Sequence, residues 1–168
     1  MPTRLLLISD THVPHRARAV PESLWAALDA ADVVIHAGDW TGIPFLDELT
    51  ARAALLIGVR GNNDTDPGFA RLPEVASTTI EGIRFAVVHE TGDASGREER
   101  AAGRFPDADV LVFGHSHIPW DTTAASGRLR LLNPGSPTDK RGQPHGTYLT
   151  AVADAGVLRD VTFIEVLP

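Results

Sequence analysis

Residues 4–12 read Arg-Leu-Leu-Leu-Ile-Ser-Asp-Thr-His. The apolar residues Leu5 to Ile8 form an unbroken run, which is typical of a strand that is buried on both faces. The polar residues Asp10 and His12 follow this run almost directly. The rest of the chain repeats this arrangement, in which a buried strand delivers polar side chains at its carboxyl end.

Two further strands of this kind are predicted in the first half of the chain. Val33-Val34-Ile35 is a second apolar run, and residues 54–59 form a third. Apolar residues at helical spacing predict helices over residues 21–31 and 43–52, which lie between these strands. Strands that alternate with helices favour a parallel sheet.

The second half of the chain contains more hairpins. The predicted elements are a hairpin of strands 78–80 and 84–88, a helix over 96–104, a strand over 110–113, a hairpin that turns at Ser126-Gly127, and a hairpin of strands 147–153 and 157–166 that turns at Ala155-Gly156. Together with the first half, this pattern predicts an α/β fold in which two mixed sheets pack face to face. We expect one domain, residues 1–168, because the length fits a single core and no linker or repeat interrupts it.

Composition excludes several classes of protein. The chain has no cysteine, so disulfides, thiolate metal sites and cysteine nucleophiles are excluded. Its formal net charge is −7, which argues against bulk binding of nucleic acid. The first apolar run is too short for a signal peptide or a membrane span, so we expect a cytoplasmic protein that does not bind membranes.

Seven polar residues follow the predicted strands, each close to the point where a strand ends. They are Asp10 and His12 after the first strand, Asp39 after the second, Asn62 after the third, His89 after residues 84–88, and His115 and His117 after residues 110–113. Because the carboxyl ends of parallel strands meet in one crevice, we expect these side chains to lie close together. Carboxylates and imidazoles bind transition metals, so the pattern predicts a metal site.

Each motif also has a simpler interpretation. Asp10-Thr11-His12 alone is an Asx turn with an exposed histidine, and Gly38-Asp39 alone is a common turn. His89 alone is more often a structural histidine than a ligand. Gly114-His115-Ser116-His117 is harder to explain in this way, because two histidines flank one small residue after a buried strand. The simple interpretation holds for most single motifs and fails for the ordered set.

The ordered set Asp-x-His, Gly-Asp, Gly-Asn-x-Asp, His and Gly-His-x-His resembles the calcineurin-like metallophosphoesterases. The resemblance runs from Asp10 to at least Ser136. The short length, the variant Gly61-Asn62-Asn63-Asp64 and the segment Asn133-Pro134-Gly135-Ser136 are similar to the small prokaryotic phosphodiesterase branch. The resemblance implies a four-layer αββα sandwich of two mixed β-sheets flanked by helices.

The resemblance also implies two divalent metal ions, with manganese expected first and nickel, iron or zinc as alternatives. One ion would take Asp10, His12, Asp39 and His117, and the other would take Asp39, Asn62, His89 and His115. The carboxylate of Asp39 would bridge the two ions. Asp39, Asn62 and His89 are the residues expected to serve catalysis.

The implied reaction is hydrolysis of a small organic phosphate ester by in-line attack of a metal-bridging hydroxide. A phosphodiester is the favoured substrate, and a phosphomonoester is the close alternative. A different class of function is a non-catalytic protein-interaction scaffold with the same fold. The chain is also free to form a homo-oligomer.

The chain departs from many relatives at the position of the general acid. Asn63 stands where these relatives carry a histidine that can protonate the leaving group, so leaving groups that need no proton should be favoured. Trp40 either stacks on the substrate or packs in the core. Four cations, Arg97, Arg100, Lys140 and Arg141, are candidates for lining the approach to the metals and binding a second phosphate ester. For Arg97 and Arg100, a solvated helix face is the favoured interpretation.

Overall fold

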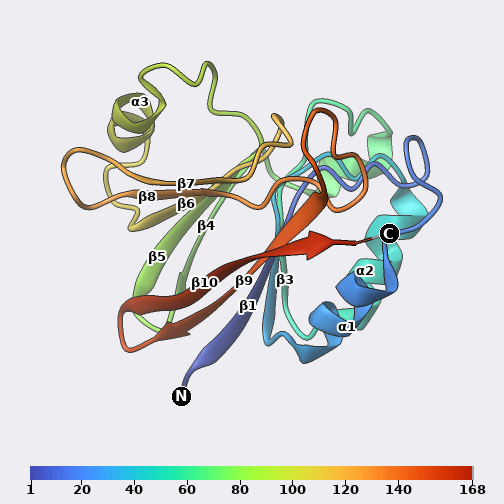
Figure 1. Cartoon of the computed structure of the whole chain (residues 1–168), viewed down its shortest axis with the longest axis horizontal. Helices are drawn as coiled ribbons and strands as arrows, with labels where there is room; N and C mark the ends of the chain where they lie inside the picture. The colour runs from blue at the N-terminus through green and yellow to red at the C-terminus, as the bar shows by residue number, and fades with distance from the viewer. Residues whose placement is uncertain (168) are drawn as a thin grey trace.

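A computed structural model describes residues 1–167 of the chain, and it contains two five-stranded sheets (Figure 1). The first sheet has the strand order β10-β9-β1-β2-β3. In that order, its strands span Val157–Val166, Gly146–Asp154, Thr3–Ile8, Val33–His36 and Leu56–Gly58. Strands β1, β2 and β3 are parallel, and β9 is antiparallel to both of its neighbours, so the sheet is mixed.

The second sheet has the strand order β4-β5-β6-β8-β7. In that order, its strands span Val75–Ile80, Ile83–Val88, Val110–Val112, Arg130–Asn133 and Trp120–Thr123. The three inner strands are parallel, and the two edge strands are antiparallel to their neighbours. This sheet is therefore mixed as well.

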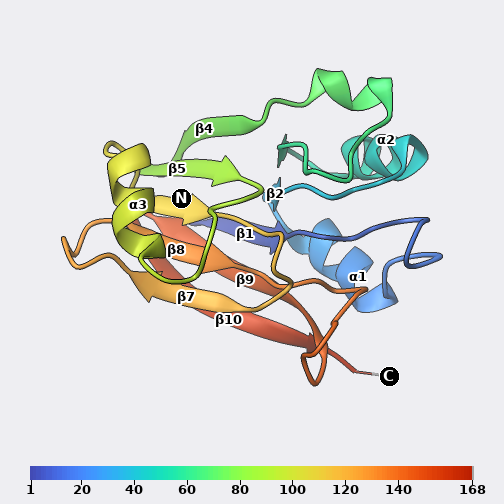
Figure 2. The ribbon, with the colours of Figure 1, turned by 90° about the horizontal axis from the view of Figure 1, so that it is seen from above.

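Helices cover the outer face of each sheet. Helices α1 (Glu22–Ala30) and α2 (Ile43–Arg52) lie on one side of the pair of sheets, and α3 (Arg97–Arg104) lies on the other (Figures 1 and 2). The expected four-layer αββα sandwich is confirmed. No helix among residues 1–167 combines the length and the apolar character needed to cross a membrane.

Strand β1 explains why its apolar run is unbroken. Leu5 and Leu7 point into the core between the two sheets, whereas Leu6 and Ile8 point into the core beneath α1 and α2. All four side chains are at most 2% exposed. Burial of one such side chain contributes roughly 1.5–3 kcal/mol, so both faces of this strand stabilise the sandwich.

The boundaries of several elements differ from those predicted. Strand β3 is shorter than residues 54–59, because it is an edge strand whose pairing with β2 covers Leu56 to Gly58. Strand β4 begins earlier than residue 78, because its backbone pairing with β5 continues to Val75. A 3₁₀ turn at Pro67–Arg71 was not predicted. It buries Phe69 against the α1–α2 side of the first sheet.

Candidate metal centre

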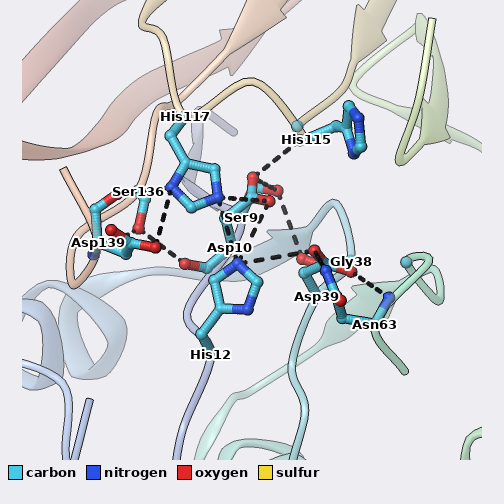
Figure 3. Close-up of polar contacts among 12 residues, drawn as sticks. Ser9, Asp10, His12, Gly38, Asp39, Asn63, His115, His117, Ser136 and Asp139 are labelled. Carbon is cyan, nitrogen blue, oxygen red and sulfur yellow. Dashed lines mark hydrogen bonds and ion pairs between the residues drawn. The ribbon is translucent and has the colours of Figure 1, made fainter. Parts of the chain in front are cut away.

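The seven polar residues predicted from the strand ends lie together at one edge of both sheets. Atoms of Asp10, His12 and His117 lie within 4.8 Å of one another, and so do atoms of Asp10, Asp39 and His89. Figure 3 shows the side chains of Asp10, His12, Asp39 and His117 gathered around one space. Loops that follow strands of both sheets therefore supply one polar cluster.

Asn62 and His115 extend the cluster on the side of His89. The Oδ1 atom of Asn62 lies 3.0 Å from His89 Nε2 and 3.0 Å from His115 Nδ1. The imidazole rings of His89 and His115 meet edge to face, with 5.2 Å between their centroids. Both residues therefore share the amide oxygen of Asn62 as a polar neighbour.

The backbone of the cluster is strained. Ten non-glycine residues of the described chain have positive φ, and half of them are candidate ligands: Asp10, His12, Asp39, His115 and His117. This conformation costs such residues of order 1–3 kcal/mol each, and it persists only where the surrounding structure enforces it. Its concentration here indicates that the loops are shaped for a site rather than for local stability.

Two of the histidines are oriented by backbone carbonyl groups. The Nδ1 atom of His89 lies 2.8 Å from the carbonyl oxygen of Ala37, and that of His117 lies 2.6 Å from the carbonyl oxygen of Asp139. A carbonyl oxygen only accepts hydrogen bonds, so each Nδ1 must donate one. In the neutral ring this leaves the lone pair on Nε2, which is the atom that faces the carboxylates. Metal-binding histidines are commonly held in this way.

Asp10 has one carboxylate oxygen that is satisfied and one that is not. Its Oδ2 atom accepts hydrogen bonds from Ser9 Oγ at 2.7 Å and from the backbone N–H of His115 at 3.0 Å. Its Oδ1 atom is buried and has no hydrogen-bond partner among the described residues. A buried carboxylate oxygen without a partner is costly, and a cation would satisfy it.

Asp39 lies between the two groups of histidines. Its Oδ2 atom is 3.6 Å from His12 Nε2, and its Oδ1 atom is 3.4 Å from His89 Nε2. Asn63 orients this carboxylate with two hydrogen bonds: its backbone N–H donates to Oδ1 at 2.9 Å, and its Nδ2 donates to Oδ2 at 2.6 Å. One carboxylate therefore faces both sides of the cluster.

The buried carboxylates favour positive charge in this space. Burial works against protonation of His89, but the nearby side chains of Asp39 and Asp10 raise the pKa of His89 to about 9. Burial likewise works against the charged form of Asp39, yet His89 and Asn63 hold the pKa of Asp39 below its usual value. Burial lowers the pKa of His12, against the pull of Asp39 and Asp10. A divalent ion would replace the proton that the pair of carboxylates otherwise attracts.

Three supporting residues were not predicted from the sequence. Asp64 accepts hydrogen bonds from the backbone N–H groups of Asp39, Thr41 and Gly61 at 2.7–2.9 Å, so it joins the loop that carries Asp39 to the loop that carries Asn62.

His36 is fully buried and connects the loop that carries Asp39 to the loop that carries Asp10. Its Nδ1 accepts a hydrogen bond from Gly38 N–H at 3.1 Å, and its Nε2 lies 3.0 Å from Thr11 Oγ1. Ser136 Oγ donates to the carbonyl oxygen of Asp10 at 2.7 Å.

Part of this support has a signal in the sequence. Asp64 completes the motif Gly61-Asn62-Asn63-Asp64, and Ser136 completes Asn133-Pro134-Gly135-Ser136. Position 114 requires glycine for a steric reason, because a Cβ atom there would collide with Ser9 Oγ and Asp10 Oδ2. His36 has no comparable signal, since it reads as the last residue of a buried strand.

The residues considered for substrate contact have different outcomes. Trp40 is fully buried, stacks on His36 with 3.5 Å between ring centroids, and donates a hydrogen bond to the carbonyl oxygen of Val59 at 2.8 Å. It therefore packs in the core. The expectation that Arg97 lies on a solvated helix face is wrong. Its side chain is buried between the rings of Phe113 and Trp120, which attract the guanidinium group.

The other three cations lie on the surface. Arg100 is exposed, as expected, and donates to the backbone carbonyl groups of the loop before α3. Arg141 donates to the carbonyl oxygen of His115 at 3.3 Å, so it lies at the rim of the cluster. Lys140 donates instead to the carbonyl oxygens of Gln143 and Pro144, within its own loop.

Comparisons with known proteins give a consistent result. Residues 3–156 match the calcineurin-like phosphoesterase superfamily domain. A probable metallophosphoesterase of Methanothermobacter thermautotrophicus is 37% identical over 139 residues, which is 80% of this chain and 77% of that protein.

Solved structures share the whole architecture. The solution structure of Thermotoga maritima protein TM1076 has a TM-score of 0.77 and 31% identity, and the match covers 98% of this chain and 99% of the other. Vps29 of Entamoeba histolytica in complex with Zn²⁺ has a TM-score of 0.77 over 97% of this chain and 98% of the other. Its sequence identity of 24% supports a common fold.

Proposed function

Because the chain belongs to the calcineurin-like phosphoesterase superfamily, we propose that it is a metal-dependent phosphodiesterase that hydrolyses a small organic phosphate ester. The observation that carries the proposal is the buried carboxylate oxygen of Asp10 that lacks a hydrogen-bond partner among residues 1–167. This atom, Oδ1, lies 3.3 Å from His117 Nε2. A cation at this point would satisfy both atoms.

The cluster would hold two divalent ions. Asp10, His12 and His117 would bind one ion, and Asn62, His89 and His115 would bind the other, with Asp39 shared between them. Such a pair of ions supplies Lewis-acid polarisation of a phosphoryl oxygen and makes water a strong nucleophile at neutral pH. Oxygen and nitrogen ligands without thiolates suit manganese, which we propose as the first choice, and also nickel, iron and zinc.

The protein's own residues define which esters would react fastest. Asn63 lies beside Asp39, and its amide cannot act as a general acid. No other histidine follows His89 directly, because Glu90 and Thr91 occupy the next positions. We therefore propose that the enzyme acts best on esters whose leaving group departs without protonation.

Two alternatives remain in the same fold. A phosphomonoesterase would use the same ligands, because the metal site alone does not distinguish the two kinds of ester. A protein-interaction scaffold would not need the metal-binding side chains at all. The strained conformation of five candidate ligands supports an enzyme over a scaffold, because a surface used only for docking has no need of it.

The test combines metal content with hydrolysis. The purified protein is reconstituted with manganese, nickel or zinc, or left without metal, and then assayed on bis(p-nitrophenyl) phosphate and p-nitrophenyl phosphate. We expect about two ions per chain and metal-dependent cleavage, faster on the diester. Faster cleavage of the monoester would favour the phosphomonoesterase. Reconstituted protein that binds no metal and cleaves neither ester would support the scaffold.

A further inference from the structure

A cavity of about 610 Å³ opens beside the candidate metal centre, on the side of Asn62 and His89. Its volume lies in the range of cavities that bind small organic ligands. Arg60, Arg100 and Arg104 line it, so three cationic side chains surround a space that begins at two candidate metal ligands.

Arg100 and Arg104 stand out among the arginines of this acidic chain. Of the 14 arginines, ten lie within 4.0 Å of a carboxylate: Arg4, Arg16, Arg52, Arg60, Arg71, Arg84, Arg128, Arg130, Arg141 and Arg159. Among residues 1–167, the four others are Arg18, Arg97, Arg100 and Arg104. Arg97 is buried between two rings, and Arg18 lies outside this cavity. The two remaining arginines without a carboxylate partner, Arg100 and Arg104, therefore both line the cavity.

Both guanidinium groups are exposed and contact neighbouring parts of the chain. Arg100 donates to the carbonyl oxygen of Ser95 at 2.6 Å and to that of Asp93. Arg104 lies over the ring of Phe105, with 5.0 Å from its Cζ to the centroid, and its Nη1 is 3.5 Å from the carbonyl oxygen of Glu90. The other N–H groups of Arg104 have no acceptor within the part of the chain that the structure describes, so they are available to a ligand.

Carboxylates in the cavity do not cancel this charge. Glu74 is paired with Arg60, with 2.7 Å between Oε1 and Nη2. Glu90 also lines the cavity, but its Oε1 atom lies 3.9 Å from His115 Nε2. Two cations without ion pairs thus face one carboxylate that is close to a histidine, and the balance is positive although the whole chain carries −7.

We infer that this cavity binds a second anionic group of the substrate, a carboxylate or a phosphate, next to the phosphate ester held at the metal centre. The cavity also offers carbon surface from Val88 and Phe105 to the part of the substrate that joins the two anions. This inference rests on the proposed function and narrows its substrate class to phosphate esters that carry a second anion. Arg104 is the residue with the most free donors for it.

Ligand binding tests the inference without relying on turnover. Dissociation constants of three phosphonates are measured by calorimetry on the zinc-loaded protein, at a fixed concentration of free zinc. Propylphosphonate has no second anion, 3-phosphonopropionate adds a carboxylate, and propane-1,3-bisphosphonate adds a phosphonate. We expect 3-phosphonopropionate, propane-1,3-bisphosphonate or both to bind about tenfold more tightly than propylphosphonate, as one charge-assisted hydrogen bond predicts. The ligand with the larger gain identifies the kind of anion.

Variants assign the gain to the cavity. Arg104→Gln should lose most of the preference, and Arg104→Lys should keep part of it because the charge remains. Arg18→Gln is the matched control, since it removes an exposed arginine that also lacks a carboxylate partner but lines a different cavity. Its preference should equal that of the wild type. Equal binding of all three phosphonates, or a full preference in Arg104→Gln, would overturn the inference.

The outcome is separable from that of the proposed function. Wild-type protein that cleaves bis(p-nitrophenyl) phosphate but binds the three phosphonates equally would refute the second anion site and leave the phosphodiesterase intact. Protein that prefers the ligands with a second anionic group but cleaves no ester would support the anion site and refute the proposed reaction.

Discussion

The Nε2 atoms of His12 and His117 lie 3.2 Å apart, although 105 positions separate these residues in the chain. Both side chains are about 1% exposed, and Asp10 Oδ1 lies 3.3 Å from His117 Nε2. Two buried imidazole nitrogens at this distance repel each other when both carry lone pairs. A shared cation removes that conflict, so the folded protein should bind divalent metal more strongly than the unfolded chain does.

Metal binding should therefore raise thermal stability. At a free manganese concentration about 100 times the dissociation constant, the gain is about 2.7 kcal/mol, which corresponds to a rise in Tm of roughly 5–10 °C. Scanning calorimetry with manganese and with EDTA measures this shift. His117→Gln should lose most of it, whereas His15→Gln, which changes an exposed histidine, should keep it. An equal shift in both variants would mean that the metal binds elsewhere.

Asp39→Asn should be the most damaging single change to the site. The carboxylate of Asp39 faces both His12 and His89, so an amide at this position would weaken the binding of both proposed ions at once. We expect metal content to fall below one ion per chain and diester hydrolysis to fall by at least roughly 100-fold. Asp47→Asn is the control, because Asp47 is an exposed aspartate on α2 that pairs with Arg71, away from the candidate ligands. Full metal content and activity in Asp39→Asn would refute the assignment.

The sequence predicts the fold well where one physical pattern dominates. Helix α2 begins and ends at the predicted residues, because its apolar face and flanking residues agree. The set of candidate ligands is also predicted, because each ligand follows a predicted strand and parallel strands end at the same edge. These features depend on local pattern plus one rule of topology.

Features that depend on tertiary packing are missed. Arg97 reads as an exposed helix residue, and only the fold brings the rings of Phe113 and Trp120 to either side of it. The cavity combines four separate segments around residues 60, 74, 90 and 104, so no single motif indicates it. Asp64 is visible in a motif, but its three backbone partners are not.

Asp64→Ala should destabilise the protein more than a typical loop substitution. It leaves three backbone N–H groups without their acceptor, in a place where the side chain is buried. We expect a loss of about 3 kcal/mol in the free energy of unfolding, measured by urea denaturation in EDTA so that metal does not contribute. Asp66→Ala is the control in the same segment. Asp66 is exposed and accepts one hydrogen bond, from Gly68 N–H, so its loss should cost about 1 kcal/mol.

A second measurement separates the role of Asp64 in the site from its role in stability. Manganese affinity of Asp64→Ala should fall by roughly 10-fold or more, because the loops that carry Asp39 and Asn62 are no longer joined. Asp66→Ala should retain the affinity of the wild type. Unchanged affinity in Asp64→Ala would show that the loops hold their positions without this carboxylate.

His36 should make the metal-free protein less stable in mild acid. Burial holds the pKa of His36 well below 6.5, and the hydrogen bond that its Nδ1 accepts from Gly38 requires the unprotonated ring. Below pH 6.5 the unfolded chain therefore binds a proton that the folded chain does not, so this group's contribution to stability is lost as the pH falls. The slope attributable to it approaches 1.4 kcal/mol per pH unit.

Urea unfolding in EDTA between pH 5 and pH 8 isolates this contribution. His36→Asn should be less stable than the wild type at pH 8, because it loses the stacking on Trp40, but its stability should fall less steeply below pH 6.5. The difference between the two curves should narrow with acid, since all other titrating groups are common to both proteins. His15→Asn, which removes an exposed imidazole, should keep the steep fall of the wild type. Parallel curves for the wild type and His36→Asn would show that another buried group governs the acid response.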